Sequence, residues 1–231
     1  MQLKFTKTVH LRITRKVKPL KFTYQLNNDV ISDVNEYKYL GVIIFPDLRW
    51  SQHIQNICSS ASRKLGLLRR KLRSAAPSVK LQAYNSLVRP KLEYAGIVWE
   101  PNTKKNASQL EMVQRRAIRL INGKYNRLDS PSSLMIANNI SSLQHRRKIA
   151  RLKFLSLLYH NRLRIESSLY LSPSSSRETR HHHQYSLEPI FARTNIFKYS
   201  FFPRTITDWN ALPRDIFFAP DFNGAFESHT F

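Results

Sequence analysis

The sequence has few cysteines and few glycines, and both shortages exclude classes of site. Its single cysteine, Cys58, excludes an intramolecular disulfide and any multi-cysteine zinc site. Cys58 falls on the apolar stripe of an expected helix, so we expect a buried structural thiol and not a nucleophile. The five glycines form neither a GxGxxG nor a GxxxxGK[ST] pattern, which argues against a dinucleotide or P-loop nucleotide site.

Acidic residues are also scarce. The chain of 231 residues has 38 Lys and Arg against 15 Asp and Glu, a net charge of +23 at pH 7. A polyanion best neutralises such an excess, so nucleic acid is the expected partner. No apolar run approaches the roughly 18–20 residues that span a bilayer, and Met1–His10 lacks the apolar core of a secretory signal. We therefore expect a protein of the nucleus or cytoplasm, neither secreted nor embedded in a membrane.

The sequence offers little for catalysis. Two-metal phosphoryl chemistry needs clustered carboxylates, and the densest acids are Asp29, Asp33 and Glu36, at an expected turn where solvated side chains are the simpler interpretation. The run His181–His183 has no carboxylate or thiolate partner, so we expect no dedicated metal site there. His53 and His145 lie near expected helix starts without partners for a catalytic triad. We predict no catalytic residue and no metal ligand.

Hydrophobic periodicity predicts an α+β, mainly α fold. Short extended runs at Val9–Ile13, Phe22–Leu26 and Tyr39–Phe45 predict a small N-terminal antiparallel β element, with a turn at Asn27–Asp29. A basic helical bundle and a C-terminal helical or irregular extension should follow. The expected helices are Ser51 to Leu72, Leu81 to Trp99 with a kink at Pro90, Leu110 to Ile121 with a stop at Gly123, Pro131 to Ala137, and Ser141 to His160.

These patterns divide the chain into five parts. We expect a β element at 1–50, a basic helical domain at 51–128, further helices at 129–171, a linker or exposed loop at 172–199, and an aromatic segment at 200–231, in which Pro203 should start a short helix. The large aromatic residues Trp50, Trp99, Trp209, Phe201 and Phe202 are able to stack on bases. Because they occupy hydrophobic positions, core packing is favoured for them.

The basic residues are unevenly distributed. From Tyr37 to Leu128 there are 18 Lys and Arg but only four acids, and from Ser130 to Ile165 seven basic residues and no acid. Basic side chains often only solvate a helix, but here the alternating acids are missing, which favours phosphate binding without sequence selectivity. The candidate contacts to RNA, DNA or an RNA–DNA hybrid are Arg63, Arg69, Arg70, Arg73, Arg115, Arg116, Arg119, Arg146, Arg147 and Lys148.

Five segments, in this order, resemble the downstream part of a non-LTR (LINE-type) retrotransposon reverse transcriptase. They are YKYLGV at Tyr37–Val42, DLRWSQHI at Asp47–Ile54, LVRPKLEYA at Leu87–Ala95, LEMVQRRAIRLI at Leu110–Ile121 and SFFPRTITDWNALP at Ser200–Pro213. The resemblance covers about Lys7 to Pro213. It implies that Tyr39, Leu40 and Gly41 belong to the hairpin that grips the primer end. It also implies that the helices from Ser51 to Ile121 are the thumb, which closes over the template–primer duplex.

The resemblance also bears on chemistry. Lys7-Thr8 resembles the Lys-Thr of the preceding palm motif, whose lysine assists the leaving pyrophosphate, although Lys4 stands where the family usually has asparagine. The family's catalytic Tyr-X-Asp-Asp motif and its other metal-binding aspartate would precede Met1, and no Asp-Asp pair occurs in this sequence. Mg²⁺ would be bound by those missing aspartates. We therefore expect no cofactor in this chain and no polymerase activity from it alone.

Three interpretations remain open at this point. The first is a nucleic-acid-binding part of a reverse transcriptase, comprising the last palm strands, the thumb and a C-terminal extension. The second is a domesticated RNA- or DNA-binding helical module that works without catalysis. The third is a product that barely folds, because its small sheet has lost its partner strands. The upstream reading frame would separate the first two.

Overall fold

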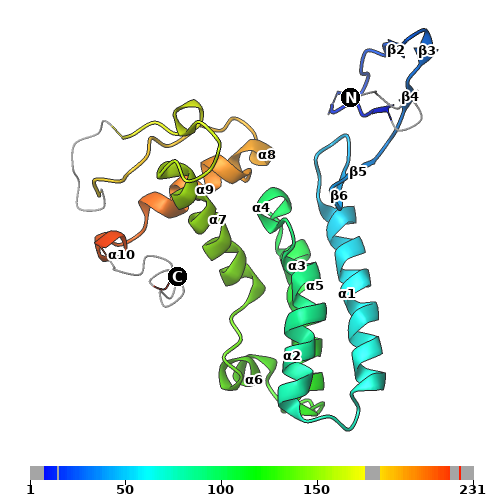
Figure 1. The fold of residues 1–231 in the computed structure, drawn as a ribbon, viewed down its shortest axis with the longest axis vertical. Helices are drawn as coiled ribbons and strands as arrows, with labels where there is room; N and C mark the ends of the chain where they lie inside the picture. The colour runs from blue at the N-terminus through cyan, green and yellow to red at the C-terminus, as the bar shows by residue number, and fades with distance from the viewer. Residues whose placement is uncertain (1–7, 15, 175–182, 219–223, 225–231) are drawn as a thin grey trace.

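The chain folds mainly into helices, with a small β element at its N-terminus, as predicted. A computed structural model describes residues 8–14, 16–174, 183–218 and 224. In Figure 1 the short strands extend from one end of an upright helical bundle, and the C-terminal helices lie beside that same end. The β element thus lies apart from most of the helices, beyond the start of α1.

In the part of the chain that the structure describes, six short strands pair two by two. They are β1 (Val9–His10) with β4 (Ser32–Asp33), β2 (Gln25–Leu26) with β3 (Asp29–Val30), and β5 (Tyr37–Tyr39) with β6 (Val42–Ile44). The pairing of β1 with β4 is parallel, so the expectation of a purely antiparallel element is wrong there. A parallel pair needs a long connection, and residues 11–31, which contain the β2–β3 hairpin, supply it.

Two tight turns shape this region. Asn27 and Asn28 have φ of +49° and +66° and form the expected turn between β2 and β3. The run Tyr39–Phe45 is not a single strand, because Leu40 and Gly41, with φ of +45° and +86°, turn it into the β5–β6 hairpin. Positive φ at both central residues is typical of the two-residue turns that suit hairpin twist.

Most of the helices lie where the hydrophobic periodicity predicts them. They are α1 (Ser51–Lys71), α2 (Pro77–Leu87), α3 (Arg89–Glu93), α4 (Gly96–Trp99), α5 (Lys104–Asn122), α6 (Pro131–Ala137), α7 (Leu143–Tyr159), α8 (Asn195–Lys198), α9 (Phe201–Asn210) and α10 (Arg214–Phe218), with a 3-10 turn at Ser167–Leu169. Gly123 ends α5 in the left-handed conformation, and Ser142 caps α7 by accepting a hydrogen bond from the backbone of His145.

One helix prediction is wrong. The segment from Leu81 to Trp99 is not one helix kinked at Pro90, because α2 ends at Leu87 and α3 ends at Glu93. Tyr94 leaves the helical conformation, and Ala95 adopts left-handed φ of 52° before α4 begins. The indole nitrogen of Trp99 then donates to the carbonyl oxygen of Tyr94 at 2.8 Å, which closes the break.

Two hydrophobic cores hold the helices together. The first joins α1, α2, α3 and α5 around Ile54, Tyr84, Leu110 and the fully buried Trp99. The second joins the rest of α7 to α9 around Leu152, Leu155, Ile206 and the fully buried Trp209. Helix α7 contributes to both cores, because its first residue, Leu143, belongs to the first. Core packing is thus confirmed for Trp99 and Trp209, while Trp50, Phe201 and Phe202 are partly buried.

The segment 172–199, expected to be a linker or exposed loop, is mostly exposed in its described part but packs against α9 around Leu187. Pro173 bridges to Leu187, and His183, Ser186 and Leu187 are buried. Asn210 of α9 explains this, because its side-chain amide donates to the carbonyl of Leu187 at 2.7 Å and its oxygen accepts from the Leu187 amide at 2.9 Å. His181 and His182 of the histidine run lie outside the described residues.

Candidate nucleic-acid interface

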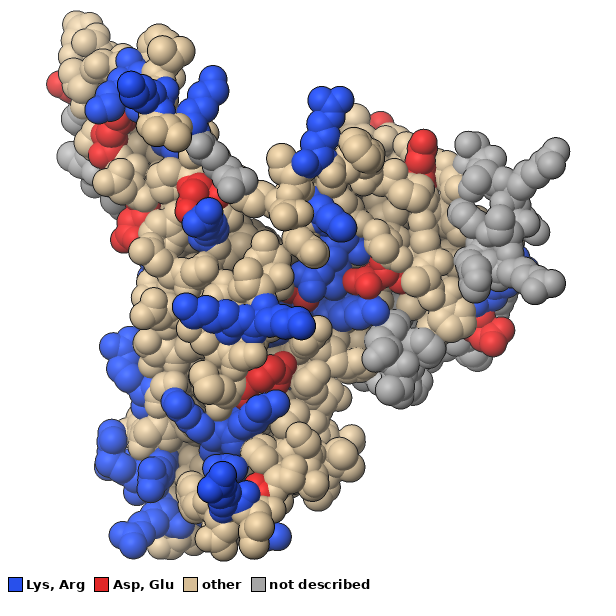
Figure 2. Space-filling model, turned by 180° about the vertical axis from the view of Figure 1, so that it is seen from behind, with Lys and Arg blue, Asp and Glu red and all other residues tan. Residues whose placement is uncertain are grey.

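The outward sides of α1 and α5 carry a dense set of exposed cations. Six of the predicted arginines lie here and are exposed, and four lysines that the prediction did not single out accompany them. We call this set the α1–α5 basic surface; it consists of Arg63, Lys64, Arg69, Arg70, Lys71, Arg73, Lys104, Lys105, Arg115 and Arg116. In Figure 2 blue side chains follow one another down the helical bundle with little red between them.

The local sequence explains why these cations face outward. On α1 the buried positions Ile54, Ala61, Leu65 and Leu68 recur with helical spacing, and no acid occurs in this helix. On α5 the sole acid, Glu111, accepts a hydrogen bond from the backbone of Gln144 at 2.9 Å. None of the cations of the α1–α5 basic surface forms an ion pair with a described carboxylate. The surface therefore stays positively charged.

Arg119 and Arg69 are set apart from the other predicted arginines of α1 and α5 by their surroundings. Arg119 is only partly exposed, and its Nε is buried without a hydrogen-bond partner among the described residues. The guanidinium carbon of Arg69 lies 5.6 Å from the centre of the Tyr125 ring, just beyond the end of α5. This cation–π contact ties the end of α1 to the end of α5.

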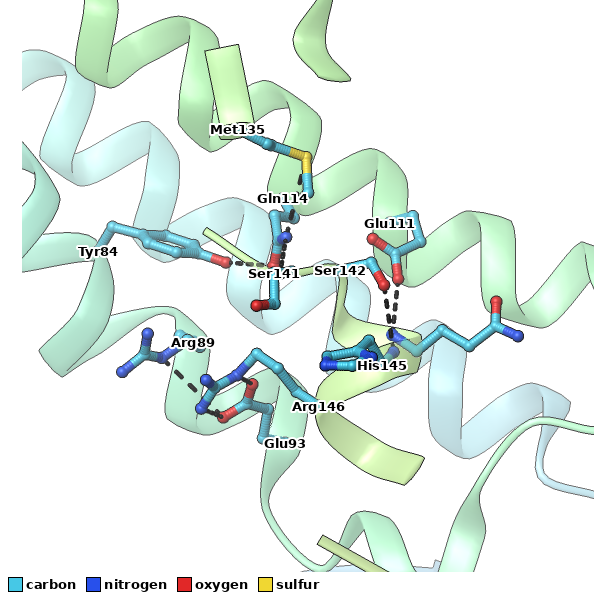
Figure 3. Close-up of polar contacts among 11 residues, drawn as sticks. Tyr84, Arg89, Glu93, Glu111, Gln114, Met135, Ser141, Ser142, His145 and Arg146 are labelled. Atoms are coloured by element: carbon cyan, nitrogen blue, oxygen red, sulfur yellow. Dashed lines mark hydrogen bonds and ion pairs between the residues drawn. The ribbon is translucent and has the colours of Figure 1, made fainter. Parts of the chain in front are cut away.

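Arg146 is not available to a phosphate in this arrangement. It forms a two-pronged ion pair with Glu93 of α3, and the contact from its Nη2 to Oε2 of Glu93 measures 3.2 Å. Figure 3 shows this pair beside a hydrogen-bonded group centred on Gln114. Gln114 accepts from the hydroxyl of Tyr84 at 2.9 Å and donates to the carbonyl of Ser141 at 2.9 Å. These contacts fasten the start of α7 to the bundle.

Two further residues of α7 that were predicted to contact nucleic acid are not freely exposed. Arg147 is 3% exposed, so the prediction that it binds nucleic acid is wrong for this conformation. Lys148 is partly buried and pairs with Asp208 of α9 at 3.3 Å. The physical reason is that α7 packs against both cores, so a run of three basic residues around its circumference cannot all face solvent.

An ionic cluster that the sequence did not reveal joins the two cores. Arg151 of α7 is buried and pairs with Glu100, and its Nη2 lies 2.9 Å from a carboxylate oxygen of Asp208. Arg204 of α9 lies 3.2 Å from the other carboxylate oxygen of Glu100. The cluster connects the segment after α4 with α7 and α9. It gives the Ser200–Pro213 block a structural role.

The β5–β6 hairpin, which contains the predicted primer-grip residues, is fixed against the bundle. Its exposed turn presents Tyr39 and Leu40, at 58% and 72% exposure, while Val42 is buried. The hydroxyl of Tyr94 donates to the carbonyl of Leu40 at 2.8 Å. A Cβ on Gly41 would lie 3.3 Å from Cε1 of Tyr94, so this turn needs glycine for both space and φ. Lys7, the palm-lysine candidate, lies outside the described residues.

His53 of α1 contacts the hairpin through a hydrogen bond. Its Nδ1 accepts a hydrogen bond from the Ile43 amide at 3.2 Å, and its ring meets those of Trp50 and Trp99 edge-on. Burial lowers the pKa of His53 below its ordinary value of 6.5. Cys58 is only partly buried, not fully buried as expected, and burial raises the pKa of its thiol to about 11, which suits a structural thiol more than a nucleophile.

The described residues also limit other kinds of site. Within them, no helix is both long and apolar enough to cross a membrane. In the same part of the chain, no three histidine, cysteine or acidic side chains come together as a metal site would require. The acids Asp29, Asp33 and Glu36 are exposed, as expected, and Asp33 bonds to His10 at 2.6 Å.

Comparison with known proteins finds a weak similarity to an uncharacterized protein. No family model matches the chain. A Caenorhabditis elegans protein named uncharacterized protein B0403.1 is 29% identical over 128 residues, which cover 55% of this chain and 63% of that protein. No solved structure matches. The chain thus spans less than two thirds of the length of this relative.

Proposed function

We propose that this chain is the template–primer grip of a non-LTR retrotransposon reverse transcriptase. Its α1–α5 basic surface holds the phosphates of an RNA, DNA or hybrid duplex. The observation that carries the proposal is the set of exposed cations on two packed helices without carboxylate partners among the described residues. Unpaired cations repel one another, and a polyanion that binds them releases its own counterions, which favours the complex.

The hairpin supports the same proposal. The β5–β6 hairpin is held to the bundle by Tyr94 and His53. A nucleic-acid strand bound along α1 and α5 would therefore lie beside a hairpin of fixed position. The five motif segments fall on the hairpin, α1, α3, α5 and α9, and each of these elements contributes buried residues to one of the two cores. The nucleus or cytoplasm is the compartment that fits such a role.

The proposal excludes catalysis by this chain alone. The sequence has no Asp-Asp pair, and phosphoryl transfer through two metal ions needs carboxylates to hold them. Purified chain given a primed RNA template, Mg²⁺ and deoxynucleotides should extend no primer. Primer extension would refute this part of the proposal.

A pair of matched variants tests the binding surface. Arg115→Ala/Arg116→Ala removes two cations from α5, and Arg162→Ala/Arg164→Ala removes two exposed cations beyond α7. At about 0.15 M salt, we expect the first variant to weaken binding to a labelled RNA–DNA duplex roughly tenfold or more, by loss of two phosphate contacts. The second should change the dissociation constant less than about twofold. Equal weakening by both variants would mean that net charge alone, and not this surface, binds the duplex.

A further inference from the structure

A cavity of about 440 Å³ lies between the β5–β6 hairpin, α1 and α3. Ile43 of the hairpin and Ile57 of α1 contribute apolar lining, and Tyr94, after α3, contributes an aromatic ring. Its volume is in the range of pockets that take small organic molecules. The cavity therefore has room for a planar heterocycle beside an aromatic wall.

The charged side chains that line this cavity are two lysines. Lys38 of β5 and Lys91 of α3 are exposed and line it, no acid does, and neither lysine forms an ion pair with a described residue. Asn56 of α1 also lines it, and its amide, which offers both a donor and an acceptor, makes no hydrogen bond within the described part of the chain. An apolar space with an amide and two unpaired lysines suits a flat, hydrogen-bonding ring that carries phosphates.

A larger cleft of about 660 Å³, beside α7 and α9, has a different character. It is also lined by cations, but Lys148, Arg151 and Arg204 already pair there with Asp208 and Glu100. A phosphate entering that cleft would meet two carboxylates. The cavity beneath the hairpin is therefore the better anion site.

We infer that the cavity beneath the hairpin binds one unpaired nucleobase of the bound strand, with the phosphates on either side of it at Lys38 and Lys91. This inference rests on the proposed function, because it places the base within a strand that the α1–α5 basic surface holds. The base stacks beside Tyr94 and packs against Ile43 and Ile57, and Asn56 bonds its edge. A base that is already unpaired enters most easily, because no base pair has to be broken.

The test uses the full chain and three RNA–DNA duplexes of equal length. One carries a single bulged 2-aminopurine in the DNA strand, one an abasic site at the bulge, and one is fully paired. From the usual gain on stacking one base, we expect roughly 5- to 100-fold tighter binding of the bulged base than of the other two. The fluorescence of 2-aminopurine should fall on binding, since stacking on an aromatic ring quenches it.

A blocking variant keeps the test specific. Ser60→Trp places a large ring in the lining of the cavity, while Ser59→Trp places it on the exposed neighbouring position of the same helix. Ser60→Trp should abolish the preference for the bulged base and leave binding to the paired duplex intact. Ser59→Trp should preserve the preference, and circular dichroism checks that both variants fold.

The outcomes separate the inference from the proposed function. Equal binding of all three duplexes, or an unchanged preference in Ser60→Trp, would overturn the base site while leaving the grip in place. Failure to bind any duplex would overturn both. Binding of a hexaglutamate peptide that Ser60→Trp abolishes, without a preference for the bulged base, would show that the cavity takes an acidic peptide and would also overturn the inference.

Discussion

The hydroxyl of Tyr94 donates a hydrogen bond to the carbonyl oxygen of Leu40 at 2.8 Å, across 54 residues of sequence. This bond joins the tip of the β5–β6 hairpin to the break between α3 and α4. The hairpin is short and exposed on one side, so its position depends on this bond and on the contact of His53 with Ile43. These two hydrogen bonds, together with Val42, which is buried in the first core, set the position of the hairpin relative to the basic helices.

Replacement of Tyr94 by phenylalanine should loosen the hairpin without disturbing the bundle. Loss of one hydrogen bond costs about 1 kcal/mol, so the amides of Tyr37–Ile44 should exchange with solvent roughly fivefold faster. Hydrogen exchange followed by mass spectrometry measures this. Tyr125→Phe, which keeps the ring beside Arg69, is the control and should leave these rates unchanged. Equal rates in Tyr94→Phe and wild type would show that the hairpin is held by other contacts.

Arg147 and Arg151 form a natural comparison, because both are buried and lie one turn apart on α7. All three guanidinium nitrogens of Arg147 lack hydrogen-bond partners in the described chain, and burial lowers its pKa. Arg151 instead pairs with Glu100 and Asp208. Arg151→Met should lower the free energy of unfolding by about 3–5 kcal/mol, because it leaves Glu100 short of a partner.

Arg147→Met should leave the free energy of unfolding unchanged or raise it by up to about 2 kcal/mol, since it removes an unpaired buried cation and keeps an unbranched stem. That stem packs near Gly96, where an added Cβ would lie 3.5 Å from it. Urea denaturation of both variants measures the difference. A loss for Arg147→Met as large as that for Arg151→Met would contradict the assignment of Arg147 as unpaired.

Stability should depend on pH through His53. Burial keeps the folded-state pKa of His53 below the ordinary value of 6.5, so the folded protein holds this ring neutral where the unfolded chain binds a proton. The contribution of neutral His53 to the free energy of unfolding is therefore complete above about pH 6.5 and decreases as the pH falls below that value. Urea denaturation between pH 7.5 and 5 should show a smaller pH dependence in His53→Gln than in wild type. Identical curves would mean that His53 titrates normally in the folded protein.

Asn210 should hold the segment around Leu187 in place. Asn210→Ala removes both hydrogen bonds to the backbone of Leu187 and leaves two buried polar groups unpaired, which costs roughly 1–3 kcal/mol. Limited proteolysis should then cut more rapidly near Leu187. Asn195→Ala, on the exposed start of α8, is the matched control and should not change the cleavage rate.

The sequence predicts the helices of this protein better than their environments. Helices α1, α5, α6 and α7 follow from local spacing and from local boundary residues such as Gly123 and Pro131, so periodicity finds them. The break at Ala95 escapes prediction, because the hydrophobic phase continues through it while a left-handed alanine is uncommon. Leu40 at positive φ is missed for the same reason.

The same contrast between helix position and environment applies to the residues of the candidate interface. The arginines of α1 and α5 could be placed outward because each helix packs one stripe against the first core. The exposure of Arg146, Arg147 and Lys148 depends on Glu93, on the second core and on Asp208. These lie in distant parts of the chain. No local pattern contains that information, and the missing acids of α1 were the stronger guide to the exposed surface.

The dependence of binding on salt tests the central claim most directly. The dissociation constant for an RNA–DNA duplex is measured between about 50 and 300 mM salt, for wild type and for Arg115→Ala/Arg116→Ala. If the α1–α5 basic surface binds phosphates, affinity falls steeply with salt in wild type, and the logarithmic slope is shallower by about 2 in the variant. An affinity that does not change with salt, or a slope that the variant leaves unaltered, would contradict the account.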